Sequence, residues 1–417
     1  MIIVFACFLL FSLYLGLAKP NAFIILYLLA TTKFLGFVDI EQMFVFGGTG
    51  LGMPSLNSVT FLTAFIQYTK KKVPWKYHLF IFCFLLFFLY GIILPVFLNY
   101  ESIYQAFITS KESWTISLLL YLASYRKTLN ERLIITCIKN IGLYLTFLYL
   151  FFIITSISPP CYYASGVFKA FYPTYISFAL FLLHYDFQIG LVKFKKMILL
   201  SIFLFIGLMT AGHFSLVIGT ATSLIIYYCV YKNSNFSVKR LFIRTIIIIY
   251  SFLLLFFSSN DFRETITTQV TIIATGEDDA LKSRDSYNLF RLNAIADRPL
   301  TGYGFIHKSA PITKKYQINQ NNRFSERFSV IDSGYIDLLI KFGSIGTSLY
   351  LLFWGYMIYK VLKNSTKHNP LQLLMAFYIL QYFPVNFTWS VLTYSHGLVP
   401  AFIATYFILK KNITFQH

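Results

Sequence analysis

The sequence predicts an all-α protein: a polytopic transmembrane helical bundle of about 12–13 spans, with one large extracytoplasmic loop containing short helices. Composition, apolar runs and the placement of basic residues lead to this class. Of the 417 residues, 57% are hydrophobic and 12% are charged, and the mean hydropathy is +0.65. Ordinary soluble proteins carry about 25% charged residues, and disordered chains cannot be this apolar. The composition therefore excludes both classes.

The apolar runs have the length of membrane helices. A helix needs about 20 predominantly apolar residues to cross the hydrocarbon core of a bilayer. The first run lacks a basic segment before it and a good cleavage site after it, so we expect a membrane helix there rather than a signal peptide. The orientation of the N-terminal side depends on two short runs, 55–69 and 112–125. The candidate spans are 2–17, 21–38, 55–69, 78–98, 112–125, 133–156, 171–187, 197–211, 214–231, 241–258, 334–361, 368–386 and 390–409.

Basic residues gather in alternate connections between these runs. The net charge is +19, from 35 Lys and Arg against 16 Asp and Glu. Cytoplasmic loops carry the excess of Lys and Arg in membrane proteins, so the charge indicates topology, and we expect no nucleic acid partner. The clusters lie at 70–76, 126–132, 193–196, 232–240, 360–367 and 410–411, and the connections 99–111, 157–170, 212–213, 259–333 and 387–389 then face outward.

The connection 259–333 differs from the others. It holds 9 of the 16 acidic residues and ten basic ones, and a loop of this length is usually functional. The chain therefore divides into N-terminal transmembrane helices (1–258), a large extracytoplasmic loop (259–333), and C-terminal transmembrane helices with a short cytoplasmic tail (334–417). The five cysteines form no CxxC pair, and the loop has no Asp-x-Asp or histidine cluster. We expect neither a disulfide framework nor a metal site.

The loop contains a row of arginines. Residues 283–298 are expected to form a helix that ends before Pro299, with Arg284, Arg291 and Arg298 seven residues apart. Seven residues are two helical turns, about 10.5 Å along the axis. Arginine offers planar, bidentate donors to anionic oxygens. The row therefore fits a partner with several such oxygens, or else a solvated face paired with neighbouring acids.

Two further features of this region have alternative interpretations. Gly302 and Gly304 form a G-x-G turn, whose backbone N–H groups could cradle phosphate or could simply allow a tight turn. Asp332 precedes the run at 334–361. It can cap that helix, and it can act as a general base at the membrane mouth. Within the run, Asp337 and Lys341 are four residues apart and are expected to pair.

Three segments resemble the bacterial O-antigen ligase/polymerase membrane family. Residues 284–305 are similar to its arginine, proline and G-x-G sequence. Residues 332–346, which end in Gly343-x-x-Gly346, are similar to its segment of histidine-asparagine, leucines and G-x-x-G, and residues 207–216 to a threonine-x-serine-arginine turn. The spacing from Arg291 to Gly302 also resembles an R-x10-G pattern of polymerases. This chain has Asp332 where the ligases have histidine, and His213 where the third motif has arginine, which favours a repeat-unit polymerase.

The resemblance implies a glycosyltransferase that joins undecaprenyl-pyrophosphate-linked oligosaccharide repeat units into O-antigen, capsule or exopolysaccharide. Because the loop has no Asp-x-Asp or histidine cluster, we expect the transfer to be independent of metal. Its expected place is the bacterial inner membrane, with the large loop extracytoplasmic. The expected partners are the lipid-linked donor and acceptor and membrane lipids, and a chain-length regulator protein is a candidate partner. Two alternatives are a ligase that moves the glycan to another acceptor and a lipid-glycan flippase. Flippases usually carry internal repeats and polar groups at mid-membrane, and the sequence shows neither.

The resemblance also suggests roles for individual residues. Cationic donors should stabilise charge on the leaving diphosphate, and we expect Arg284 and Arg291 to supply them. Asp332 is the expected base for the attacking hydroxyl, with His307 and Glu326 as alternatives. No cofactor is expected. The residues expected to bind the pyrophosphate or the rest of the substrate are His213, Lys169, Arg298, His307, Arg323 and Arg327.

Overall fold

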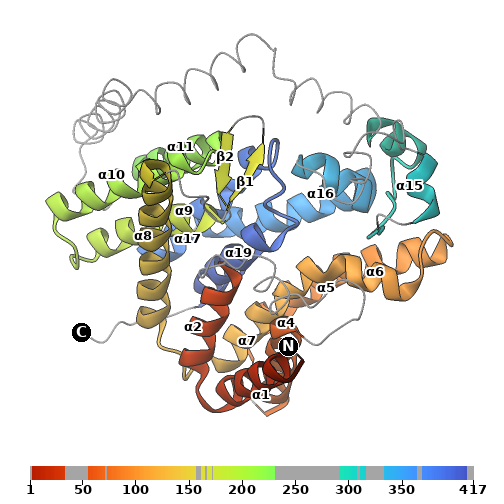
Figure 1. Cartoon of the computed structure of the whole chain (residues 1–417), viewed down its shortest axis with the longest axis horizontal. Helices are drawn as coiled ribbons and strands as arrows, with labels where there is room; N and C mark the ends of the chain where they lie inside the picture. Colours follow the sequence, from red (N-terminus) through yellow and green to blue (C-terminus); the bar gives the residue numbers. More distant parts are fainter. Residues whose placement is uncertain are drawn as a thin grey trace, which may run out of the picture.

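The computed structural model is a bundle of helices with one short β-hairpin (Figure 1). It describes residues 2–32, 55–70, 73–155, 161–164, 167–170, 172–230, 291–307, 310–315, 333–363 and 369–410. The first half contains α1 Ile2–Ala18, α2 Pro20–Thr31, α4 Leu56–Lys70, α5 Trp75–Phe97, α6 Ile103–Thr109, the 3₁₀ helix η1 Ser110–Thr115, α7 Ile116–Tyr125 and α8 Glu131–Thr155. The second half contains α9 Thr174–Gln188, α10 Phe194–Thr210, α11 Phe214–Val230, α15 Pro311–Lys315, α16 Gly334–Lys363, α17 Pro370–Leu380, α18 Tyr382–Val385 and α19 Ser395–Leu409.

The connection after α8 adds one short β-hairpin to a fold that is otherwise helical, in agreement with the all-α prediction. Strands β1 Cys161–Ala164 and β2 Val167–Ala170 pair antiparallel, with Cys161 opposite Ala170. Their tyrosine, phenylalanine and valine residues favour extended backbone. Sequence analysis treated this stretch only as a loop because it is too short to carry a clear alternating pattern.

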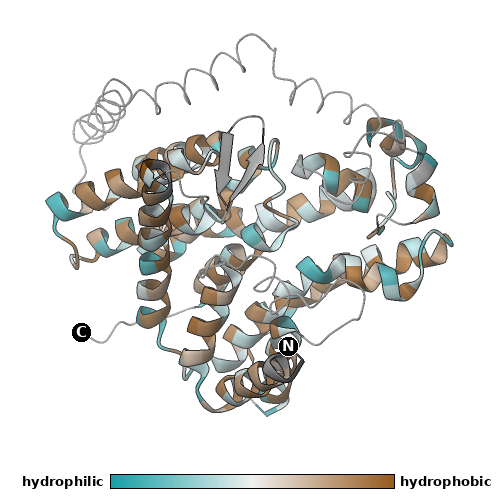
Figure 2. Ribbon diagram, in the orientation of Figure 1, coloured by the Kyte–Doolittle hydropathy of each residue, from teal (hydrophilic) through white to brown (hydrophobic). Residues whose placement is uncertain are grey.

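Three helices in the described part of the chain are long and apolar enough to cross a membrane: Trp75–Phe97, Glu131–Phe151 and Gly334–Lys363. Shorter apolar helices accompany them, and Figure 2 shows hydrophobic residues along most of the length of the bundle helices. Large apolar side chains on the outer faces are exposed, among them Phe82 at 59% and Leu352 at 66%. Such continuous apolar faces suit contact with lipid, so the helices support a membrane protein.

Helices α9, α17 and α19 form the centre of the bundle. Their residues are buried on nearly every face, as expected for helices that are apolar all round. A small polar network joins α9, α11 and α17: the Ser177 and Thr220 hydroxyls both donate to Gln381 Oε1, at 2.9 and 2.8 Å. Hydrogen bonds between helices of this kind add specificity to apolar packing.

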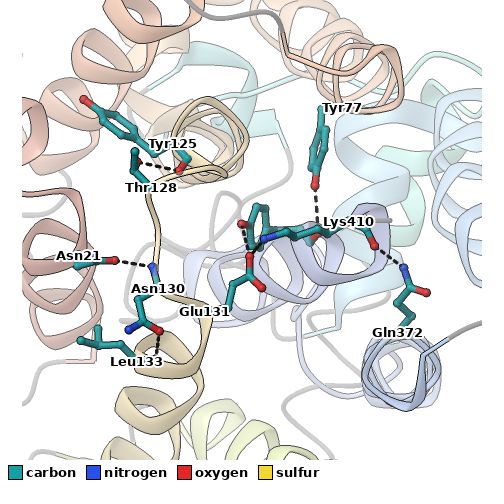
Figure 3. Close-up of polar contacts among 10 residues, drawn as sticks. Asn21, Tyr77, Tyr125, Thr128, Asn130, Glu131, Leu133, Gln372 and Lys410 are labelled. Atoms are coloured by element: carbon teal, nitrogen blue, oxygen red, sulfur yellow. Dashed lines mark hydrogen bonds and ion pairs between the residues drawn. The ribbon is translucent and has the colours of Figure 1, made fainter. Parts of the chain in front are cut away.

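One end of the bundle holds a cluster of ionic contacts, which we call the Lys410 end (Figure 3). Lys410 forms an ion pair with Glu131 at the start of α8, and Gln372 Nε2 donates to the Lys410 carbonyl at 2.6 Å. Nearby, the fully buried Asp186 accepts hydrogen bonds from Arg132 and Lys139 of α8. The predicted topology assigns this end to the cytoplasm.

The opposite end, which we call the His213 end, contains the turn between α10 and α11 and the first residues of α9 and α19. Helix α19 starts there at Ser395 and reaches the Lys410 end after 15 residues, about 22 Å at 1.5 Å per residue. The Thr174 hydroxyl at the start of α9 donates to the His396 carbonyl at the start of α19. These contacts fix the relative direction of the central helices, so His213, Thr174 and His396 share one end.

Candidate functional site

Helix α16 is broken at Gly343, and a loop segment fills the break. Gly343 has φ 63° and ψ −174°, so the helical hydrogen bonds around it cannot form. Segment 299–305 supplies the missing partners: Tyr303 N donates to Ile340 O at 2.7 Å, Gly304 N to Lys341 O at 2.9 Å, and Ser344 N to Pro299 O at 2.7 Å. Backbone polar groups that leave a helix inside an apolar protein need such partners. The two glycine motifs therefore form one structural unit.

The close approach explains the glycines. Gly302 and Gly304 both have positive φ, 68° and 79°. A Cβ on Gly302 would lie 2.5 Å from Gly343 N, and one on Gly304 would lie 2.4 Å from Pro95 Cδ. The amides of residues 302–305 all donate to backbone carbonyls, including Phe305 N to Gly91 O at 2.7 Å. The phosphate-cradle interpretation of G-x-G is therefore wrong, and the turn interpretation is confirmed.

Lys341 lies just before the break. Its ammonium donates to Asp337 Oδ2 at 2.7 Å, which confirms the expected i,i+4 pair. The lysine side chain is 12% exposed and the aspartate side chain 1%. The ammonium also lies 4.8 Å from the centroid of the Tyr394 ring and 5.7 Å from that of Phe305, both within the range of cation–π attraction. A charge at this depth is a functional candidate by default.

A pocket opens beside this lysine, and we call it the Lys341 pocket. Its walls come from α5, η1, α16 and the chain around the start of α19. The Thr393 hydroxyl in its lining is buried and has no hydrogen-bond partner among the residues that the structure describes. Lys341 is the one charged residue among those that line it: Phe84, Phe87, Phe88, Ser113, Phe305, Lys341, Phe342, Tyr350, Leu392, Thr393 and Leu398.

A stack of rings occupies the His213 end next to this pocket. The His213 ring lies 4.2 Å from that of Trp389, and the Trp389 ring lies 4.3 Å from that of His396, at interplanar angles of 24° and 6°. The ring of Tyr394, which contacts Lys341, lies 6.0 Å from that of His396. His213 is 9% exposed. Ring contacts therefore connect His213 to the lysine.

Most of this cluster is absent from the residues predicted from the sequence. Trp389, Tyr394 and His396 lie in an expected outward connection and at the start of the last helix. The run from Thr388 to His396 combines aromatic, hydroxyl and imidazole groups at the mouth of a membrane helix, and this was a usable signal. For Lys341, the sequence predicts only the ion pair with Asp337.

The arginine row is described in part. Residues 291–297 are helical, in agreement with the prediction for 283–298, and Arg291 is half-buried at their start. The Arg298 guanidinium carbon lies 5.1 Å from the Tyr100 ring centroid and 5.8 Å from that of Tyr303. Arg298 thus packs against the chain that follows α5, through aromatic rings. Arg284, Arg323, Arg327, Glu326 and Asp332 lie outside the described residues.

The remaining predicted residues have separate surroundings. His307 donates its backbone N–H to Glu101 Oε2 at 2.9 Å. Lys169 lies on β2 opposite Tyr162, and its side chain is outside the described part. At the surface, Lys315 donates to Asp297 at 2.5 Å, and this hydrogen bond raises the pKa of the Lys315 ammonium. Among the described residues, no three His, Cys, Asp or Glu side chains converge as metal ligands.

The fold and the cation–aromatic cluster define a helical membrane protein with a charged site at one end of its bundle. Residues 197–351 match the family model described as O-antigen ligase. The match contains all three motifs that carry the resemblance and supports the O-antigen ligase/polymerase family. It crosses the predicted boundaries at 258 and 333, and it supports a membrane glycan-processing enzyme of the glycosyl-transfer type. No curated protein matches the chain.

Proposed function

We propose that this protein is a polymerase that joins undecaprenyl-pyrophosphate-linked oligosaccharide repeat units into a surface polysaccharide, by metal-independent glycosyl transfer. The observation that carries the proposal is the family match over residues 197–351, the stretch that contains the arginine row and the break in α16 at Gly343. The departures at Asp332 and His213 favour polymerisation over ligation. The proposed site faces outward from the bacterial inner membrane, and a chain-length regulator remains a proposed partner.

The proposed reaction exchanges the bond between a sugar and the lipid diphosphate for a glycosidic bond between two sugars. A hydroxyl of one lipid-linked repeat unit attacks the anomeric carbon of the second, a new C–O bond forms, and the bond from that carbon to the diphosphate oxygen breaks. The diphosphate leaves with the electron pair, and Asp332 takes the hydroxyl proton. Arg284 and Arg291 stabilise the negative charge on the leaving group, each through hydrogen bonds of about 1.5–3 kcal/mol.

The structure supports a fixed position for the described end of the arginine row, at Arg298. The Gly302 amide donates to the Arg298 carbonyl at 3.2 Å, and the residues that follow are bound to the break in α16. The helical residues 291–297 therefore end at an anchored point beside the break in α16. A lipid-linked glycan donor that binds this row needs no closure of the loop to reach the membrane helices. The arginines are then already in place to stabilise the negative charge on the leaving diphosphate.

The description of the matched family favours a ligase as the second candidate function. The two are separated by the products of purified protein in lipid nanodiscs with a lipid-diphosphate-linked repeat unit as its substrate. A ladder of products that differ by one repeat unit would support the polymerase. A single transfer to an added acceptor would support the ligase. Movement of the substrate across the bilayer without new glycosidic bonds would overturn both in favour of a flippase.

A further inference from the structure

We propose that Lys341 forms a second anion subsite, in which its ammonium binds a phosphate of the polyprenyl-diphosphate substrate at the mouth of the Lys341 pocket. This inference rests on the proposed function and names a contact on the membrane side of the arginine row. Lys341 is then a positioning residue for the lipid end of the substrate. It acts in addition to Arg284 and Arg291.

The first observation is the unused donor capacity of the ammonium. An ammonium group has three N–H donors. Among the described residues, Asp337 is the one hydrogen-bond partner of Lys341 Nζ, and the rings of Tyr394 and Phe305 contact the same group. Aromatic faces attract a cation through its charge. An anionic oxygen, in contrast, accepts a hydrogen bond from one of the cation's N–H groups. A phosphate oxygen can therefore accept a further hydrogen bond from the Lys341 ammonium while Asp337 stays paired with it.

The second observation is the surroundings of the lysine. The walls of the pocket are mainly phenylalanine and leucine, and Lys341 is the one charged group among the described residues that line it. A charge–charge contact is stronger in such a setting than in water. The enclosed volume is about 10 Å³, room for about one water molecule. The phosphate must therefore bind at the mouth of the pocket. The lysine side chain, which lines this pocket, is 12% exposed.

The third observation is the path for the lipid. The outer face of α5 exposes Leu86, Leu89 and Ile93, and that of α16 exposes Leu349 and Leu352, all by 48% or more. These two helices pack against each other beside the pocket. A polyprenyl chain along these faces places its phosphate end at the lysine, because apolar chains stay in the hydrocarbon while charged groups seek the polar end.

The backbone links this subsite to the arginine row. The Lys341 carbonyl accepts the Gly304 amide, and the Arg298 carbonyl accepts the Gly302 amide. Lys341 and Arg298 are therefore attached to the same short segment, 299–305. A substrate with its glycan at the row and its lipid between helices passes this segment, so the diphosphate is within the region where both cations act.

The test measures binding to full-length protein in neutral phosphatidylcholine nanodiscs. The probes are polyprenyl diphosphate without glycan, polyprenyl alcohol and inorganic diphosphate. Because Lys341→Met alone would leave Asp337 buried without a counter-ion, the main variant is the neutral pair Asp337→Asn with Lys341→Met. Lys363→Met, at the exposed end of the same helix, is the matched control. We expect the double variant to bind polyprenyl diphosphate about tenfold more weakly or worse, and Lys363→Met to bind it as the unchanged protein does.

Two further readouts separate a subsite from a structural ion pair. Asp337→Asn alone should bind the diphosphate lipid at least as tightly as the unchanged protein, because the competing carboxylate is gone. Polyprenyl alcohol should bind all variants equally. Competition by inorganic diphosphate that is weaker in the double variant would show that Lys341 recognises the phosphate and not the lipid. Unchanged diphosphate affinity in the double variant would overturn the proposal, as would equal losses in Asp337→Asn and the double variant.

The failure of this inference can be told from failure of the proposed function. If the unchanged protein makes polymer while the double variant binds the diphosphate lipid with full affinity, the Lys341 subsite is wrong and the polymerase stands. If the unchanged protein binds the lipid through Lys341 but forms no glycosidic bond, the polymerase is wrong and the subsite stands.

Discussion

The Ser344 amide donates a hydrogen bond to the Pro299 carbonyl at 2.7 Å, across the break in α16. This bond joins two motifs that are about 40 residues apart in the chain. One motif carries the end of the arginine row, and the other carries Lys341. The break thus fixes a loop segment to a membrane helix through backbone atoms.

The first prediction concerns Gly343→Ala. The backbone at φ 63° and ψ −174° is accessible essentially to glycine alone, and a Cβ would lie 2.3 Å from the Leu300 carbonyl carbon. We expect a loss of at least about 1–3 kcal/mol in the free energy of unfolding. Gly355→Ala is the matched control in the same helix, because its Cβ would meet no atom within 4 Å. Thermal unfolding in detergent compares the two, and equal midpoints would contradict the role of Gly343.

The second prediction concerns the ion cluster of the Lys410 end. Asp186 is fully buried and accepts from both Arg132 and Lys139. Asp186→Asn leaves two cations close together without their counter-ion, and removal of one partner from a buried pair costs about 3–5 kcal/mol. A large drop in the unfolding midpoint is expected. Asp297→Asn is the control, since the Asp297–Lys315 pair is exposed on both sides and surface pairs contribute little. A similar drop in both variants would count against the buried-pair argument.

Hydrophobicity alone located most of the helices. The runs predicted at 78–98, 133–156 and 214–231 correspond to α5, α8 and α11, whose ends lie within a few residues of those limits. Long apolar stretches are visible in a sequence because a membrane span must be apolar over its whole length. The predicted span at 241–258 lies outside the described residues.

The arrangement of the candidate site was harder to predict from the sequence than the helices were. Sequence analysis expected 334–361 to be one continuous helix, because Gly343-x-x-Gly346 is compatible with an ordinary helix. The break depends on segment 299–305, which is distant in sequence, and no local pattern specifies that partner. The stack of His213, Trp389 and His396 likewise joins a turn to the last helix. Contacts between separate elements cannot be obtained from periodicity.

The third prediction concerns the side of the membrane. In a cysteine-free background, Lys195→Cys and Thr388→Cys place single thiols at exposed positions at opposite ends of the bundle. The positive-inside rule predicts that a membrane-impermeant maleimide labels the thiol at 388 in intact cells and reaches the one at 195 only after the membrane is opened. The reverse pattern would put the arginine row in the cytoplasm and would end the proposed function with it.

The fourth prediction concerns the proposed leaving-group contact. Arg291→Ala should abolish chain growth while the protein still inserts, because the charge on the departing diphosphate loses a bidentate donor. Arg291→Lys should restore only part of the activity, since an ammonium keeps the charge without the planar pair of donors. Asn293→Ala is the matched control, an exposed neighbour in the same helical stretch. Polymer length in cells and the amount of membrane-inserted protein are the two measurements. Normal polymer from the alanine variant at normal protein levels would remove Arg291 from the mechanism and leave Arg284 to carry the leaving-group contact.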